Sequence, residues 1–156
     1  MRAGINDMET VMSGPSVAAP AGTGSIAGIV NTPSPHGVSE TVSVLTEEIA
    51  AAGAKVFAVV DHSGEAARVE LSLRETKLVI FGNPKGGTGV MAVAPLAAID
   101  LPLKLLVWED DEGAVWMSHL DPQWLAERYG LAADMTAPLA APGALAGRAA
   151  AHADEK

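Results

Sequence analysis

The sequence predicts an α+β protein with a mostly antiparallel sheet covered by two helices, in the order β-α-β-β-β-β-α. Short runs of β-branched and aromatic residues bounded by glycine, proline or polar clusters predict strands at residues 26–31, 55–61, 78–81, 103–108 and 114–120. Apolar residues recur at helical spacing in residues 38–52, which predicts an amphipathic helix. Two amphipathic helices need a sheet against which to bury their apolar stripes.

The chain divides into three regions by composition. Residues 1–25 are rich in Gly, Ala, Ser and Pro and have no hydrophobic period, so we expect a disordered leader that buries too little surface to offset its ordering entropy. Residues 26–130 hold all the predicted elements and form a single α+β domain. Residues 131–156 are mostly Ala, Pro and Gly with a charged end, and we expect a flexible Ala/Pro-rich tail.

The first half of the domain alternates strands and helices. Pro33 and Pro35 end the first strand, because proline has no amide hydrogen for a ladder. The helix over residues 38–52 has Ser39 as a candidate cap and Gly53 as its terminator. Its apolar face is Val38, Val42, Leu45 and Ile49. Residues 65–71 can form a short helix between the second and third strands.

The second half is a hairpin followed by a helix. Residues 78–81 are four consecutive apolar residues. This pattern indicates either a strand buried on both faces within the domain, or a strand covered by a helix on one face and by a partner subunit on the other. Two prolines bracket residues 96–101, where we expect a short helix or an irregular lid. The acidic residues 109–112 form the tip of the hairpin. They lack the alternating ligands of a calcium loop, so we expect this tip to be solvated. Asp121 and Pro122 predict the start of the last helix.

Composition excludes several functions. The chain of 156 residues has no cysteine, so it has no disulfide, thiolate metal site or cysteine nucleophile. Its net charge of −9 disfavours binding to nucleic acid or to an anionic membrane surface. No apolar run approaches the roughly 20 residues of a membrane-spanning helix. The N-terminus lacks the apolar region of a secretory signal, so a cytoplasmic location is expected.

Several long motifs carry a family resemblance. They are FGNPKGGT at residues 81–88 followed by a Met and a Pro, IDLPLKLLVWED at 99–110, and VWMSHLDP at 115–122. The chain resembles the domain of unknown function 302 family. The resemblance implies an α+β fold and a homodimer, and it implies no activity because the family has none assigned.

The glycine-rich segment, residues 82–89, is the leading candidate site for a small molecule or anion. Glycines let the backbone approach a ligand and turn amide hydrogens toward an anion. Lys85 adds a charge, but it precedes Gly86, so the segment is not a Walker A loop. The alternative is a connector that packs against the sheet. The predicted ligand-binding residues are Gly82, Asn83, Lys85, Gly86, Gly87 and Thr88.

Histidines are the other candidates. His62 follows a strand and matches the family's VDHS-like motif, so it can be a general base, or it can satisfy backbone groups at a strand end. His36, His62 and His119 form a conceivable metal triad, but no spacing signals one, and we expect no metal and no cofactor. Trp108 and Trp116 can pair across the hairpin, either as packing or as an aromatic wall for a ligand.

Three hypotheses follow for function. The first is a homodimeric protein that binds a small molecule or anion at residues 82–89. The second is an enzyme in which His62 acts as general acid/base and Lys85 stabilises negative charge, which requires the two side chains to converge. The third is a non-catalytic assembly module whose glycine-rich segment packs against the partner subunit.

Overall fold

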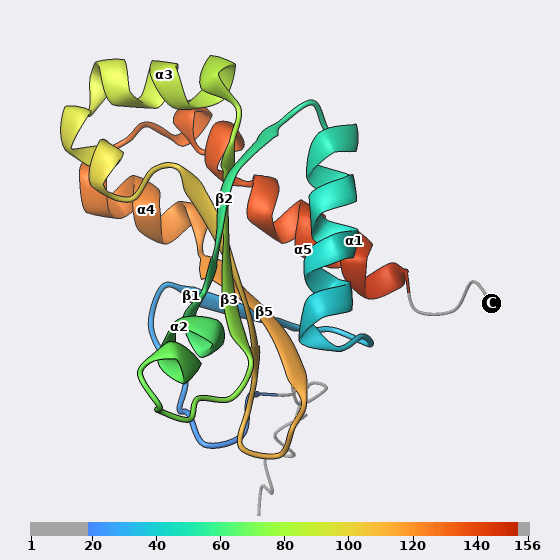
Figure 1. Ribbon diagram of the computed structural model, residues 1–156. Helices are drawn as coiled ribbons and strands as arrows, with labels where there is room; N and C mark the ends of the chain where they lie inside the picture. Colours follow the sequence, from blue (N-terminus) through green and yellow to red (C-terminus); the bar gives the residue numbers. More distant parts are fainter. Residues whose placement is uncertain (1–18, 153–156) are drawn as a thin grey trace, which may run out of the picture.

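The computed structural model describes residues 19–152, which form one five-stranded sheet with helices around it (Figure 1). The strands are β1 (Ile29–Pro33), β2 (Lys55–Asp61), β3 (Thr76–Gly82), β4 (Leu103–Glu109) and β5 (Val115–Leu120). The α-helices are α1 (Val38–Ala51), α2 (His62–Arg68), α3 (Pro84–Val93), α4 (Pro122–Tyr129) and α5 (Ala141–Ala151). Three short 3-10 helices are η1 (Pro95–Ile99), η2 (Ala133–Met135) and η3 (Ala137–Leu139).

The sheet has the order β1-β5-β4-β3-β2, and every neighbouring pair is antiparallel. The hairpin of β4 and β5 lies at its centre, and the predicted pairing of Trp108 with Trp116 across this hairpin is present. β1 is the edge strand beside β5, with Ile29 paired opposite Leu120. The prediction of an α+β fold with a mostly antiparallel sheet is confirmed, and the order of elements along the chain is roughly as predicted.

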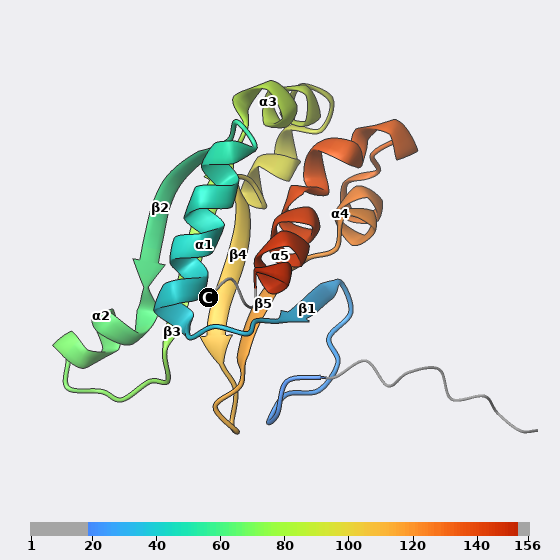
Figure 2. The ribbon, with the colours of Figure 1, turned by 90° about the vertical axis from the view of Figure 1, so that its right-hand side faces the viewer.

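Helices α1 and α5 lie side by side on one face of the sheet (Figure 2). The buried face of α1 is Val38, Thr41, Leu45 and Ile49. The predicted Val42 is partly buried and packs against this core. Thr41 is buried as well, and its hydroxyl bonds the Gly37 carbonyl oxygen at 2.8 Å and Ser34 Oγ at 2.6 Å. Alternate residues of β3, β4 and β5 complete this core, and they are Val79, Phe81, Leu105, Val107 and Met117.

The C-terminal region differs from the prediction. Residues 131–156 were expected as a flexible tail, but residues 141–151 form α5, and this helix rather than α4 is the second cover of the sheet. Its buried residues are Pro142, Leu145, Ala146 and Ala149. Alanine is a weak signal of a core in sequence, but its small side chain lets two helices approach closely, and Arg148 adds an ion pair to Glu48 of α1 at 2.9 Å.

The N-terminal leader is described only in part. Residues 1–18, like residues 153–156, lie outside the described part of the chain. Within the described remainder of the leader, the Ala21 amide donates a hydrogen bond to the Asp110 carboxylate at 2.9 Å, so this stretch is tied to the β4–β5 hairpin.

Two helices, α3 and α2, differ from the sequence prediction. The glycine-rich segment is not a loop, because Pro84 to Val93 form α3 with Asn83 as the N-cap. The short helix expected at residues 65–71 begins earlier, at His62, because Asp61 caps it by accepting the Gly64 amide at 2.9 Å. The expected short helix between the two prolines is η1.

Candidate functional site

The glycine-rich segment runs from the end of β3 into the first turns of α3. Asn83 satisfies the first amides of this helix. Its side-chain oxygen accepts from Lys85 N at 3.1 Å, and its carbonyl oxygen accepts from Gly86 N at 3.0 Å and Gly87 N at 3.1 Å. Pro84 has no amide hydrogen. The amides that were expected to face an anion are therefore used inside the helix.

A cavity of about 570 Å³ lies beside this segment. Its walls come from the end of β3, one side of α3, residues 101–103, and the stretch from η3 into α5. Five of the six predicted ligand-binding residues line it, and they are Gly82, Asn83, Gly86, Gly87 and Thr88. Lys85 does not line it, because its side chain points to solvent.

The glycines create space at this cavity. A Cβ atom on Gly86 would lie 3.2 Å from Cβ of Pro138, closer than most carbon contacts, so glycine there lets α3 approach η3. A Cβ on Gly82 would meet the Phe57 ring at 3.4 Å. Neither glycine has a positive φ. Their role is therefore close approach and not an unusual backbone conformation.

The cavity is predominantly apolar, with hydrophobic walls that include Phe81, Met91, Leu103 and Leu145. Arg148 is the one charged side chain among the described residues that line it. Its charge is balanced, because its Nε donates to Glu48 Oε2 at 2.9 Å, while His152 Nε2 lies 2.8 Å from Glu48 Oε1. The hydrogen bonds from His152 and Arg148 lower the pKa of Glu48. This arrangement suits an uncharged, apolar guest.

His62 and Lys85 lie at opposite ends of the sheet. His62 opens α2 next to the pair of Asp61 with Lys77, whereas Lys85 follows Gly82, which pairs with Lys55. Lys77 and Gly82 are five residue steps apart along β3, which is about 17 Å. Figure 1 shows α2 and α3 at the two ends accordingly. The predicted His62–Lys85 pair is therefore not assembled, and both side chains are exposed.

The three histidines of the conceivable metal triad are also apart. His36 precedes α1, His62 is the first residue of α2, and His119 lies in β5. Across residues 19–152, no group of three or more His, Asp or Glu side chains is placed to hold a metal ion. His119 is buried, and its Nδ1 lies 3.0 Å from the Leu120 carbonyl oxygen.

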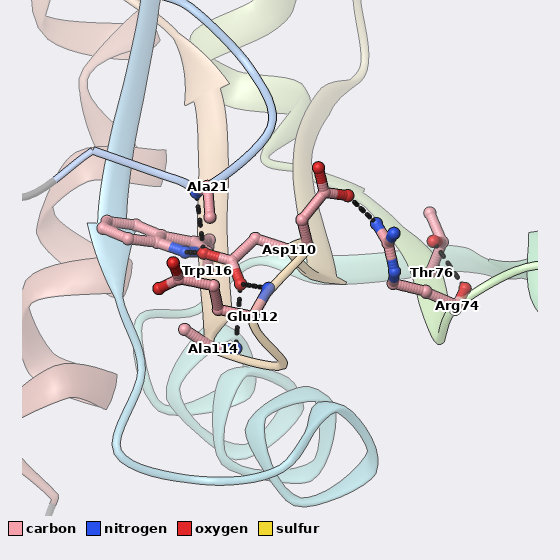
Figure 3. A network of polar contacts seen from close by, with 8 residues as sticks. Ala21, Arg74, Thr76, Asp110, Glu112, Ala114 and Trp116 are labelled. Atoms are coloured by element: carbon pink, nitrogen blue, oxygen red, sulfur yellow. Dashed lines mark hydrogen bonds and ion pairs between the residues drawn. The ribbon is translucent and has the colours of Figure 1, made fainter.

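Asp110 is the residue that the sequence reading missed. The sequence predicts a solvated acidic tip here, but Asp110 is 2% exposed and accepts four hydrogen bonds at 2.8 to 3.0 Å. The donors are the amides of Ala21, Glu112 and Ala114 and Trp116 Nε1 (Figure 3). The bond from Ala21, followed by those of the other donors, lowers its pKa to about 2. The signal for the local bonds was present, because an aspartate opening a turn often accepts the amide two residues on.

The fold and the cavity together define a class: a small α+β protein in which α1 and α5 cover one face of a single antiparallel sheet and an apolar cavity lies at one end of it. The chain belongs to the family "Domain of unknown function DUF302", whose model matches residues 30–141. The crystal structure of an uncharacterised conserved DUF302 protein from Bacillus stearothermophilus is similar in fold. Its TM-score is 0.68 at 16% sequence identity, covering 83% of this chain and all of that one.

Longer relatives contain a similar region. The chain is 41% identical over 104 residues to "Fluoride-specific ion channel FluC 1" of Brucella suis biovar 1, and equally to "Fluoride-specific ion channel FluC 1" of Brucella abortus biovar 1. The match covers 67% of this chain but only 41% and 38% of those proteins, so the chain spans about two-fifths of their length. Among the described residues, no helix is both long enough and apolar enough to span a membrane.

Proposed function

We propose that this protein binds a small, predominantly apolar molecule in the cavity beside α3. The observation that carries the proposal is that a cavity of about 570 Å³ lies beside the predicted segment, with five of its six predicted residues in the wall. This volume is within the roughly 300–1,000 Å³ of small-molecule sites, and apolar walls with a few polar groups are typical of them.

An anion is the less favoured ligand. The first amides of α3 are bonded to Asn83, Lys85 lies outside the cavity, and Arg148 is neutralised by Glu48. An anion entering the cavity would lose its hydration without gaining an unpaired donor of comparable strength. An apolar molecule gains free energy in proportion to the surface it buries.

Filling the cavity tests the proposal. Ala144 lines the cavity on α5 and is itself exposed, so Ala144→Trp places a large ring in the cavity without disturbing the core. Binding of the neutral fluorescent probe N-phenylnaphthylamine is expected to weaken at least about tenfold, because the ring replaces the buried surface of the probe. The measurement is a fluorescence titration of the full chain.

Two control variants sharpen this titration. Ala151→Trp makes the same substitution at an exposed position of α5 away from the cavity, and wild-type binding is expected. Lys85→Ala is also expected to bind as the wild type, because Lys85 does not line the cavity. Unchanged binding by Ala144→Trp would refute the cavity as the site, and weaker binding by Lys85→Ala would contradict the position of Lys85 outside the cavity.

The two other functions are supported less well. The enzyme hypothesis required the side chains of His62 and Lys85 to converge, but these residues lie at opposite ends of β3. The assembly-module hypothesis expected the glycine-rich segment to pack against a partner with no pocket nearby, whereas this segment borders the cavity of about 570 Å³. A cytoplasmic location stays a prediction from the sequence.

We also propose that the protein is a homodimer joined through the face of the sheet opposite α1 and α5. In Figure 1 the sheet is seen nearly edge-on, and the middle of its left-hand side carries no helix. This face nonetheless presents half-buried apolar side chains. They are Val60, Leu78, Ile80, Leu106 and Trp108. The uncovered side of an antiparallel sheet is polar when it faces water, so an apolar one favours a second copy.

A further inference from the structure

Phe57 interrupts the pairing of the edge strand β2 with β3. The register between these strands shifts between Val56 and Ala58, so Phe57 has no partner in β3. A bulge of this kind turns a side chain out of the regular alternation of its strand, and bulges are over-represented next to active sites. Phe57 is 48% exposed, although an aromatic ring gains much free energy from burial. Its ring is therefore displayed at the edge of the sheet and is not packed in the core.

The ring of Phe57 forms part of the wall of the cavity beside α3. One ring carbon lies next to Gly82, because a Cβ atom on that glycine would be 3.4 Å from it. Lys55 Nζ lies over the ring, 5.5 Å from its centroid, but Lys55 does not line the cavity. The surface of the ring that borders the cavity is therefore not the surface that Lys55 covers, and it is open to a guest.

The other walls of this cavity suit a flat aromatic guest. Both phenylalanines of the chain, Phe57 and Phe81, line it, although the only other aromatic residues are three tryptophans and one tyrosine. Met91 lines it too, and its methyl carbon would be 3.8 Å from a Cβ on Gly87, so no side chain separates the two. Methionine makes favourable contacts with aromatic rings. Eight lining residues are alanine or glycine, whose short side chains leave a ring system space to lie flat.

We propose that the ligand of the cavity beside α3 is a neutral planar aromatic molecule whose ring stacks on Phe57, a proposal that rests on the function given to this cavity above. Aromatic pairs gain stabilisation beyond the area that they bury, and an aliphatic guest cannot obtain this gain from the same ring. The ligand is neutral because Arg148 is already paired with Glu48. Phe57 determines the preference for an aromatic ring, and it is not among the apolar residues assigned to the homodimer.

A matched pair of competitors tests the aromatic ring. The planar aromatic alcohol is 2-naphthalenemethanol, and its fully hydrogenated counterpart, decahydro-2-naphthalenemethanol, has a similar apolar body without an aromatic ring. Each is titrated against N-phenylnaphthylamine bound to the full chain. We expect the ratio of the two affinities, aromatic over saturated, to fall about two- to tenfold in Phe57→Leu, because leucine keeps an apolar wall but has no ring. Phe57→Tyr keeps a ring and should keep the wild-type ratio.

Methyl NMR locates the bound ring in the wild-type chain. We expect 2-naphthalenemethanol to shift the methyl resonance of Met91, because both lie in the same cavity and an aromatic ring changes the magnetic field around it. The saturated alcohol has no ring current and should shift this resonance much less. Met117 is fully buried and does not line the cavity, so its resonance should stay in place with either alcohol. Met91→Leu assigns the resonance.

The possible results distinguish the aromatic ligand from the cavity itself. Displacement by both alcohols, with the same affinity ratio in the wild type and in Phe57→Leu, would overturn the aromatic ligand and leave the cavity as a site for an apolar molecule. No binding of the fluorescent probe or of either alcohol would refute the cavity as a site and the aromatic ligand with it. If Phe57→Leu fails to fold, the wild-type spectra decide, because an equal response of Met91 to both alcohols would also overturn the aromatic ligand.

Discussion

The Asp110 carboxylate joins three separate parts of the chain at the β4–β5 hairpin. One oxygen accepts from Ala21 and from the indole of Trp116, and the other accepts from two amides of the hairpin tip. Next to it, Asp111 reaches outward to Arg74, with 2.5 Å between Oδ1 and Nη1. Adjacent acidic residues therefore have different roles: Asp110 is a buried acceptor and Asp111 a half-exposed member of an ion pair.

The depressed pKa of Asp110 predicts an acid-sensitive contribution to stability. Its folded pKa of about 2 lies below the ordinary value of 3.8. Its stabilising effect is therefore complete above the ordinary pKa and is lost as the pH falls from about 4 through about 2. The urea midpoint of the wild type should fall across this window, and Asp110→Asn should have a lower midpoint at pH 7 and a shallower acid decline.

Asp111→Asn provides the comparison for this pH series. Its carboxylate is about half exposed, and surface ion pairs contribute little to stability. We therefore expect a midpoint close to that of the wild type with the same acid decline. An Asp110→Asn protein with the wild-type pH profile would show that this carboxylate does not govern the acid response.

At the scale of elements, α3 forms from a sequence that is poor in helix formers. Three of its first six residues are glycines, and only Val90 is buried. Asn83 and Pro84 nevertheless carry the cap and first-position signal that Asp121 and Pro122 carry for α4. The signal was interpreted as a helix start at α4 but not at α3, because the glycines favoured a loop.

Whether the other elements could be predicted from the sequence depends on the size of the side chains that each one buries. The apolar repeat of α1 and the β-branched runs of β2 to β5 identified these elements, because large side chains face the core. α5 packs through alanines, which have no such pattern. Five residues of the α3 cavity could be named from the sequence because they lie in one glycine-rich segment, whereas Ala144 and Arg148 reach the cavity through a contact distant in sequence.

The glycines of α3 predict a locally weak helix. A Cβ on Gly89 would meet open space, so Gly89→Ala should stabilise α3 by about 0.5–1 kcal/mol through helix propensity alone. The amides of α3 should then exchange with solvent up to about fivefold more slowly. Gly86→Ala is the matched control, because its Cβ meets Pro138 at 3.2 Å and the contact offsets the gain. Equal stabilisation by both variants would contradict this packing.

At the scale of the whole molecule, the sheet has one covered and one uncovered face. α1 and α5 cover the core side, while on the opposite side α2 lies toward one end of the sheet and α4 toward the other (Figure 1). By register, Ile80 lies on this uncovered side between Ala58 and Lys104, near the centre of the apolar surface. The four consecutive apolar residues in β3 predict that both faces of this strand are buried. A partner subunit would cover the face that α1 and α5 leave open.

The homodimer proposal predicts the effect of a charge on that face. Ile80→Glu is expected to give a monomer of 15.9 kDa where the wild type gives twice that mass, because pairing two copies would bury a carboxylate in each. Light scattering after size exclusion, over a range of concentrations, measures this. Val69→Glu introduces the same charge at a side chain 66% exposed beyond α2 and should stay dimeric. Since Ile80 does not line the cavity beside α3, ligand binding there can be assayed in the monomer. A dimeric Ile80→Glu protein would move the interface elsewhere.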